Sequence, residues 1–279
     1  MNTSILTTLL CVINFFAPGI PALSSELMDC ERCIVLCEQS QNRILIVEAG
    51  SKAVKWEWKA KNSNIAQEHH AWFDFPDEAK PVYDNKYLLI TASGGGVGLI
   101  RISDKRAIFY VYAGGNPHSA EILPDGNIVS ASSTGNFLKL FNVDTVSGPG
   151  EIYSKSYRII DGHNVVWDKK RKVLWAGSGE RLRAYTYNGS CSNPALTLSD
   201  SLRLPDNLHD LFPVYGQDAL WLTTDTMVYT LDLGKKQFKP ATSRHHKSIK
   251  SVSSGPAGFP TIIIHPQEKW WTDQVSSTA

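Results

Sequence analysis

The sequence lacks a strong imbalance of charge, a long internal apolar run and the short motifs that identify a familiar chemistry. Its 28 basic and 27 acidic residues give a net charge of +1, whereas nucleic-acid binding usually requires a basic field. No nucleophile elbow, EF-hand, zincin or P-loop pattern occurs. No stretch keeps a sustained 3.6-residue apolar period. These absences argue against a nucleic-acid partner and against a helical fold.

One apolar run does occur, at the N-terminus. Residues 5–16 are uncharged and mostly apolar, and Ala-Leu-Ser at 22–24 provides a small-x-small cleavage pattern. The run is shorter than a comfortable membrane span, so an uncleaved anchor is the less favoured alternative. We predict a signal peptide over residues 1–24, one mature domain over 25–279, secretion, and no membrane attachment after cleavage.

Cysteine is also sparse. Removal of the signal would leave Cys30, Cys33, Cys37 and Cys191, an even number that fits an oxidising compartment. The C-x2-C-x3-C run has no fourth metal ligand at a recognised spacing, so we favour disulfides or buried thiols over a metal or iron–sulfur site. Three disulfide pairings are possible. Asn188 begins an N-G-S glycosylation acceptor, which is meaningful in a eukaryotic secretory protein.

What the chain does contain is an internal repeat. Each unit has three short strands rich in β-branched and aromatic residues, separated by turns of Gly, Asp, Asn or Lys. The units begin at Lys80, His118, His163, His209 and Lys250, roughly 40 to 45 residues apart, which is the period of a four-stranded propeller blade. The repeat therefore predicts an all-β fold, a six-bladed β-propeller.

Both ends of the repeat are expected to be incomplete. Residues 33–60 match the second to fourth strands of a unit, so the first blade is expected to lack its innermost strand. The last unit stops after its third strand, so the last blade is short and the ring is incomplete at its C-terminal closure. Unpaired strand edges of this kind are expected to lower stability and favour aggregation.

Several stretches carry a family resemblance: CEQSQNRILIVE, KWEW, DEAKPV, HSAEILPDGNIVSASSTGNFLKLF, HNVVWD and HDLFPV. They resemble a secreted, WD40-like propeller family of bacteria and fungi whose biochemical role is unsettled. The resemblance covers the chain from about Cys33 to Asp273. It implies a six-bladed propeller and an exported protein, and it implies no reaction. The sequence departs from the family in lacking a closing strand at the C-terminus.

The residues that begin the five units are the candidate site. If the first strand of each blade is innermost, then Lys80, His118, His163, His209 and Lys250 should meet at one mouth of the central channel. The imidazoles of His118, His163 and His209 would suit a divalent metal, whereas the lysines favour an anionic ligand such as a uronate or sulfate group. A purely structural alternative is that the histidines bind backbone groups around the channel.

We therefore favour a secreted propeller that binds an anionic ligand, expected to be a carbohydrate, at the channel mouth without catalysis. One alternative is a metal-assisted polysaccharide lyase that acts on uronate polymers, in which an imidazole or a lysine removes a proton. The other is a non-catalytic scaffold that binds a protein partner. The sequence alone does not decide whether the protein is an enzyme.

Other conspicuous residues have simpler interpretations. The glycine-rich stretch 94–98 has no helix or GK[ST] after it, so we predict a hairpin turn. The histidine pairs 69–70 and 245–246 are expected in loops. Asp168 and Asp210 follow ring histidines closely and are expected to be turn caps rather than partners of the imidazoles.

Overall fold

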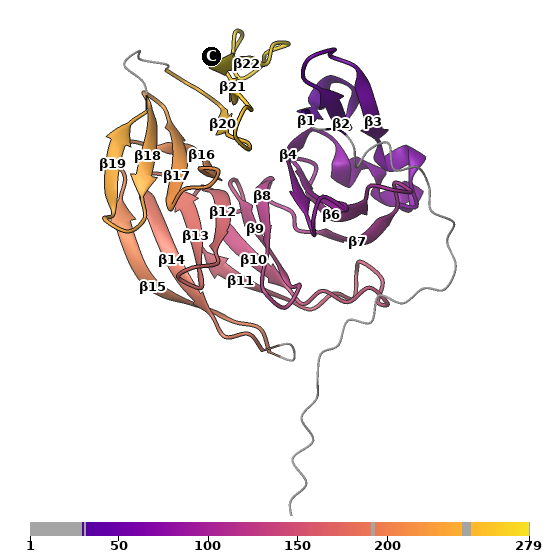
Figure 1. The fold of residues 1–279 in the computed structure, drawn as a ribbon. Coiled ribbons are helices and arrows are strands. Elements are labelled where there is room, and N and C mark those ends of the chain that lie inside the picture. Colours follow the sequence, from indigo (N-terminus) through magenta and orange to yellow (C-terminus); the bar gives the residue numbers. More distant parts are fainter. Residues whose placement is uncertain (1–29, 31, 191–192, 242–246, 279) are drawn as a thin grey trace, which may run out of the picture.

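Six antiparallel β-sheets follow one another in sequence order around a central axis (Figure 1). The predicted all-β, six-bladed propeller is thus confirmed. The computed structural model describes the chain except for residues 1–29, 31, 191–192, 242–246 and 279. The predicted signal peptide and His245-His246 lie outside the described residues. None of the described helices is long and apolar enough to cross a membrane.

Among the described residues, four sheets have four strands, and the first and last sheets have three. The strands of blades one to three are β1 (Cys33–Glu38), β2 (Arg43–Glu48), β3 (Val54–Trp58), β4 (Pro76–Val82), β5 (Tyr87–Ala92), β6 (Gly96–Arg101), β7 (Ala107–Tyr112), β8 (Pro117–Ile122), β9 (Ile128–Ser132), β10 (Phe137–Phe141) and β11 (Ser154–Arg158). Those of blades four to six are β12 (Gly162–Asp168), β13 (Val173–Ser178), β14 (Arg181–Tyr187), β15 (Leu196–Arg203), β16 (Leu208–Pro213), β17 (Ala219–Thr224), β18 (Val228–Asp232), β19 (Gln237–Pro240), β20 (Ser251–Ser253), β21 (Thr261–Ile264) and β22 (Ser276–Thr278). Short 3-10 helices are η2 (Gln39–Gln41), η3 (Ala60–Asn62) and η4 (Gln67–Phe73).

Successive strands pair because the turns between them adopt left-handed backbone conformations. Asn42, Asn136, Lys172 and Lys236 have φ values of 52°, 57°, 55° and 53°, and each lies between two strands that pair with each other. Such conformations match the right-handed twist of hairpin strands. These turns let alternate residues of every strand face one neighbouring blade or the other.

The apolar core consists of layers between blades. Each of five buried clusters is shared by two consecutive blades, from blades one and two up to blades five and six. Between blades one and two, for example, Ile46 and Trp56 pack with Ile90 and Ile100. The indole nitrogen of Trp56 also donates to the carbonyl oxygen of Ile102 at 2.9 Å. Blades are therefore held to their neighbours by apolar packing and by a few directed hydrogen bonds.

The structure corrects one detail of blade one. Its strand β1 lies beside β4, the inner strand of blade two, and β3 is the strand farthest from the axis (Figure 1). In the described part of the chain, the strand that blade one lacks is therefore the outermost, and the prediction that it lacks its innermost strand was wrong. After Trp58 the chain forms η3 and η4 instead of a fourth strand. The sequence did not reveal this, because inner and outer strands of a blade share the same short apolar pattern. The last blade is short, as predicted.

Blades one and six do not share such a layer. Within the part of the chain that the structure describes, no buried apolar cluster contains residues from both blades. On β1, Val35 and Cys37 pack toward blade two, so the alternate residues Ile34 and Leu36 face the other way and are half-buried. Ile262 of β21 is half-buried in the same manner on blade six. The described ring thus has five packed interfaces and one open seam.

Candidate functional site

A repeated irregularity places the candidate site. In four consecutive blades the pairing register of the inner strand shifts at its second residue, which is Asp77, His118, His163 or His209. A bulge of this kind re-aims a side chain at the end of a strand. In blade six Lys250 directly precedes β20, and its amide donates to the carbonyl oxygen of Ile264 at 2.8 Å. These five residues form what we call the mouth row.

The side chains of the mouth row lie next to one another. The rings of His118 and His163 stack, with centroids 4.8 Å apart and an interplanar angle of 15°. The centroids of His163 and His209 are 5.4 Å apart. At one end of the row the ammonium group of Lys250 donates to Nε2 of His209. At the other end Nδ1 of His118 is 3.4 Å from Oδ1 of Asp77.

Hydrogen bonds fix which imidazole nitrogens carry protons. Nδ1 of His163 lies 3.0 Å from the carbonyl oxygen of Asp161 and must donate to it, which leaves Nε2 as the unprotonated nitrogen. Nε2 of His118 accepts from the amide of Asn116 at 3.4 Å. Nε2 of His209 accepts from Lys250. The network therefore describes neutral imidazoles.

Burial explains why two of these imidazoles stay neutral. It lowers the pKa of His209 to about 3, and the charge of Lys250 acts in the same direction. Burial likewise lowers the pKa of His163 and that of Lys250. At neutral pH His163 and His209 thus hold neutral rings, beside the ammonium group of Lys250 at one end of the row.

Lys80 does not belong to the mouth row. The strand register makes it the counterpart of Glu121 rather than of His118, because Lys80 pairs with Leu89 as Glu121 pairs with Val129. The predicted alignment that placed it with the histidines was therefore wrong by three residues, and Asp77 occupies that position. Sequence reasoning aligned the units on basic residues, and this unit has none at the bulge.

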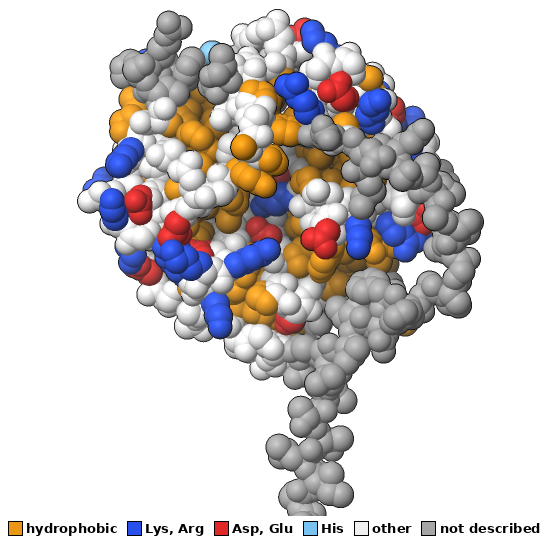
Figure 2. Space-filling model, viewed as in Figure 1, with side chains coloured by type: hydrophobic (Ala, Val, Ile, Leu, Met, Phe, Trp, Pro, Cys, Tyr) orange, Lys and Arg blue, Asp and Glu red, His pale blue; other side chains and the backbone are white. Residues whose placement is uncertain are grey.

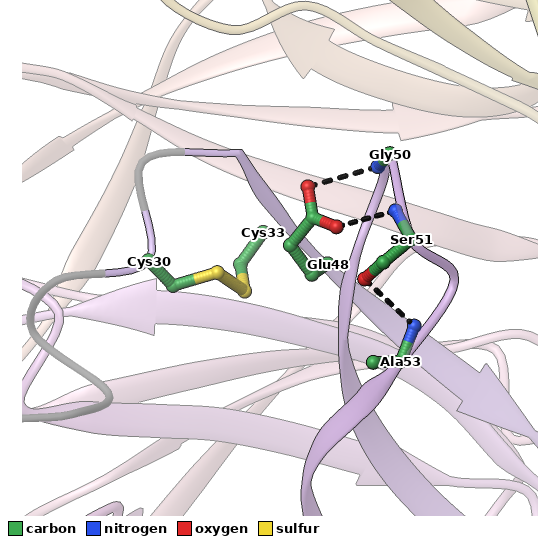
Figure 3. Close-up of a disulfide and its surroundings, with 6 residues drawn as sticks. All are labelled: Cys30, Cys33, Glu48, Gly50, Ser51 and Ala53. Atoms are coloured by element: carbon green, nitrogen blue, oxygen red, sulfur yellow. Dashed lines mark hydrogen bonds between the residues drawn. A yellow bond between two sulfur atoms is a disulfide. The ribbon is translucent and has the colours of Figure 1, made fainter.

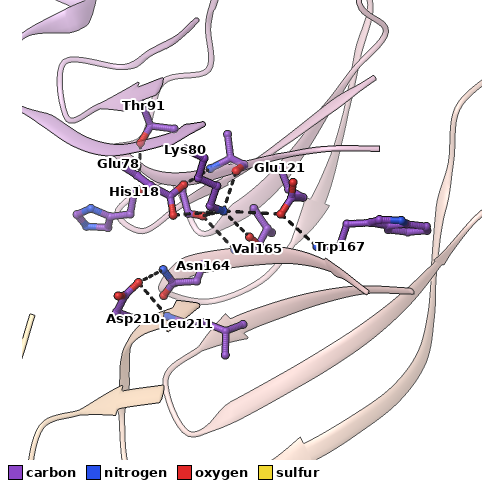
Figure 4. A network of polar contacts seen from close by, with 12 residues as sticks. Glu78, Lys80, Thr91, His118, Glu121, Asn164, Val165, Trp167, Asp210 and Leu211 are labelled. Carbon is purple, nitrogen blue, oxygen red and sulfur yellow. Dashed lines mark hydrogen bonds and ion pairs between the residues drawn. The ribbon is translucent and has the colours of Figure 1, made fainter. Parts of the chain in front are cut away.

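Lys80 instead lies deeper in the channel and is buried. Its ammonium group donates to the carbonyl oxygens of Ala120 and Val165, both at 2.9 Å. It also forms ion pairs with Glu78 at 3.2 Å and Glu121 at 3.8 Å. Burial alone would lower the pKa of Lys80, but these two carboxylates outweigh it and raise the pKa above its ordinary value. Lys80 therefore ties the inner strands of blades two, three and four together (Figure 4).

A polar floor lies directly beneath the mouth row. It consists of the residues that follow the bulges, Glu78, Ser119, Asn164 and Asp210. The Nδ2 amide of Asn164 donates to Oδ1 of Asp210 at 2.9 Å, and the two side chains face each other from neighbouring inner strands (Figure 4). Burial raises the pKa of Asp210 to about 7, and the charge of Glu78 adds to this. Figure 2 shows basic and acidic side chains at the centre of the wheel, bordered by hydrophobic ones.

Asp210 is therefore not a turn cap, contrary to expectation. Asp168 is one: its Oδ1 accepts from the backbone amides of Lys170 and Arg171 at 3.0 and 2.9 Å. The glycines at 94–98 lie at a hairpin between β5 and β6, as predicted. A side chain on Gly94 would lie 2.2 Å from the carbonyl oxygen of Ala71, so this glycine lets η4 approach closely.

His69, His70 and the glycosylation candidate Asn188 lie outside the mouth row. His69 stacks on Trp72 with ring centroids 3.7 Å apart, and Nε2 of His70 bonds the carbonyl oxygen of Ile65 at 3.1 Å. Both belong to η4. Asn188 is exposed after β14, and its amide donates to the carbonyl oxygen of Asn193 at 2.9 Å. Whether Asn188 carries a glycan stays a prediction.

The cysteines show one of the possible pairings. Cys30 and Cys33 form a disulfide at the start of β1 (Figure 3). Cys37 is a free thiol, and burial raises its pKa well above the ordinary value. Cys191 lies outside the described residues.

The mouth row does not present a metal site. No group of three or more His, Cys, Asp or Glu side chains among the described residues is placed to hold a metal ion. The stacked rings of His118 and His163 lie face to face, whereas metal ligands point their nitrogen lone pairs at one centre. Metal binding by His118, His163 and His209 stays a prediction that this geometry does not favour.

Sequence reasoning missed the acidic members of the site: Asp77, Glu78 and Glu121. A signal for the first was present, because Pro76-Asp77 begins β4 as Pro117-His118 begins β8. Alignment on the proline, rather than on the basic residue, would have placed Asp77 in the row. The acidic residues change the chemistry, since the site combines hydrogen-bond acceptors with cations.

Comparison with known proteins supports the fold and supplies a family. Residues 18–278 match the model of a family described as a family of unknown function (DUF6528), and the chain belongs to that family. A crystal structure of a protein of unknown function from Bacteroides caccae is similar, with a TM-score of 0.55 and 14% identity over 83% of this chain and 81% of that chain. At this identity the likeness shows the fold alone. No curated protein matches the chain.

Proposed function

We propose that this member of the family binds an acidic saccharide at the channel mouth and that binding, rather than catalysis, is its function. The observation that carries the proposal is the mouth row itself: His118, His163 and His209 lie at the bulges of three consecutive inner strands, Lys250 directly precedes the inner strand of blade six, and each contacts the next. A recurring position that gathers polar rings and an ammonium group at one opening is suited to hold a polar ligand.

The proposed roles differ along the row. The ammonium group of Lys250 would pair with the carboxylate of the ligand, since it is the cation of the mouth row. The half-buried ring of His163 keeps an unprotonated Nε2 that can accept from a hydroxyl group or take up a proton when an anion binds. Lys80 has no direct role in this proposal, because its ammonium group is held by Glu78 and Glu121.

A glycan array tests the proposal with three proteins: the wild type, Lys250→Met and the control Lys86→Met. Lys86 is exposed in the turn between β4 and β5, so its replacement removes one positive charge far from the row. We expect the wild type and Lys86→Met to retain uronate-containing glycans and Lys250→Met to lose them. An array without any bound acidic glycan, or equal binding by all three proteins, would refute the proposal.

The alternatives make different predictions. A metal-assisted lyase would release unsaturated uronates, which absorb ultraviolet light, and its activity would disappear with a chelator. An interaction scaffold would ignore glycans, and Lys250→Met would leave partner binding unchanged. No observation at the mouth row favours either function, so neither is proposed.

We further propose that the protein is exported, with residues 1–24 as its signal. The apolar run at 5–16 supports this proposal, and so does the Cys30–Cys33 disulfide, because such bonds persist mainly in oxidising compartments. Mass spectrometry of the protein from the culture medium tests it, and a mature chain that begins at Ser25 is the expected result. An intact N-terminus on protein retained in the cells would refute it.

A further inference from the structure

We propose that the polar floor beneath the mouth row is a second subsite for the same ligand, one that receives hydroxyl groups. The ligand would then be a sugar acid, with hydroxyl groups next to its carboxylate, rather than a bare anion. This inference rests on the proposed function and specifies which part of the ligand enters the channel.

The first argument is a pair of orphan acceptors. Among the described residues three buried side-chain atoms have no hydrogen-bond partner, and two of these are the amide oxygens of Asn116 and Asn164. Asn164 is 4% exposed, and it precedes the buried Val165 on β12. Its Nδ2 is committed to Asp210, so the orientation of the amide is fixed and Oδ1 is left as an acceptor. Buried acceptors without donors are rare in native structures.

Both oxygens belong to residues that neighbour the stacked rings of His118 and His163. Asn116 contacts Nε2 of His118 through its amide nitrogen, and Asn164 directly follows His163. His118 and His163 stack against each other, so the two orphan oxygens belong to one neighbourhood. A ligand that satisfied both would have to bring at least two hydrogen-bond donors.

The second argument is the charge balance. Asp77 and Glu78 lie at or just below the row, and Asp210, whose pKa is about 7, adds a partly ionised carboxyl group at neutral pH. Lys250 is the ammonium group of the row, and Lys80 is occupied by Glu78 and Glu121. A bare anion would meet as much repulsion as attraction at this opening. A sugar acid avoids this, because its carboxylate can pair with Lys250 while its hydroxyl groups donate to the floor.

Isothermal titration tests the inference on the mature full-length protein. The probes are D-glucuronate, which has both groups, acetate and sulfate, which have only charge, and methyl glucoside, which has only hydroxyl groups. We expect glucuronate to bind about tenfold more tightly than acetate or sulfate, the factor that corresponds to one additional hydrogen bond. Equal affinities for glucuronate and acetate would overturn the inference. This comparison uses the wild type and does not depend on the folding of any variant.

Two variants locate the subsite. Asn164→Ala and Asp210→Asn should each weaken glucuronate binding about tenfold and leave acetate binding within about twofold. Their controls are Asn62→Ala and Asp84→Asn, which change the same residue types at exposed positions away from the channel. If Lys250→Met loses glucuronate binding while Asn164→Ala and Asp210→Asn keep it, the proposed function stands and the floor subsite is overturned. Absence of any uronate binding by the wild type would refute both.

Discussion

Lys80 allows the sharpest test of how the channel is held together. Its ammonium group makes two hydrogen bonds of 2.9 Å to carbonyl oxygens of blades three and four and an ion pair of 3.2 Å within blade two. Replacement by Met keeps the length of the side chain and removes these contacts, which leaves Glu78 and Glu121 as neighbouring carboxylates without their cation. Removal of one partner from a buried ion pair typically costs about 3–5 kcal/mol. We expect Lys80→Met to lower the free energy of unfolding by about 4 kcal/mol.

Urea denaturation followed by tryptophan fluorescence measures this change, with Lys86→Met as the exposed control, which should stay within about 0.5 kcal/mol of the wild type. Because a residual buried charge is the main cause, adding Glu78→Gln to Lys80→Met should restore at least about 1 kcal/mol. In a thermal scan the single variant should melt about 8–16 °C earlier. A loss of less than about 1 kcal/mol, or a double variant that is less stable than the single one, would refute the reasoning.

Three further outcomes are expected. Asp210 has a pKa of about 7 in the folded protein and an ordinary value of 3.8, so the folded state holds a proton that the unfolded chain releases and stability falls as pH rises between these values. Urea denaturation should therefore show that the free energy of unfolding of Asp210→Asn, relative to that of the wild type, rises by at most about 4 kcal/mol between about pH 4 and pH 8. A difference that stays constant over this range would contradict the prediction. His209 has a pKa of about 3 against 6.5, so wild-type stability falls as pH falls through that window, and His209→Gln should flatten the profile. Gly94→Ala should cost about 1–3 kcal/mol because its methyl group meets the backbone of Ala71, while Gly148→Ala, with nothing within 4 Å, should be neutral in the same assay.

The sequence was sufficient to predict the wheel and most of the mouth row. Strand length, turn residues and the period of the repeat are local properties, and they identify a propeller without any knowledge of packing. His118, His163, His209 and Lys250 recur in phase with that period, so their meeting at one mouth followed from the fold. The period of the repeat carries no information on whether these residues bind a ligand.

What the sequence could not provide depends on register and on burial. A bulge shifts one residue relative to its partner, and the letters DEAKPV by themselves do not show that the bulge falls at Asp77 rather than near Lys80; the signal lies in the preceding Pro76, which matches Pro117. The neutrality of His209 likewise depends on burial and on contact with Lys250, which lies far away in the sequence. The strand missing from blade one could not be identified either, because inner and outer strands share the same short apolar pattern.

The seam between blades one and six has a consequence for how the protein comes apart. With five packed interfaces in a row and none joining the two ends in the described chain, the blades behave as a linear array in which each one is stabilised only by its neighbours. Unfolding can then begin at either terminal blade and proceed inward. In a closed propeller ring, by contrast, two interfaces must break before any blade is released. Amide exchange should therefore be slowest in blades three and four and quicken toward both ends of the arc.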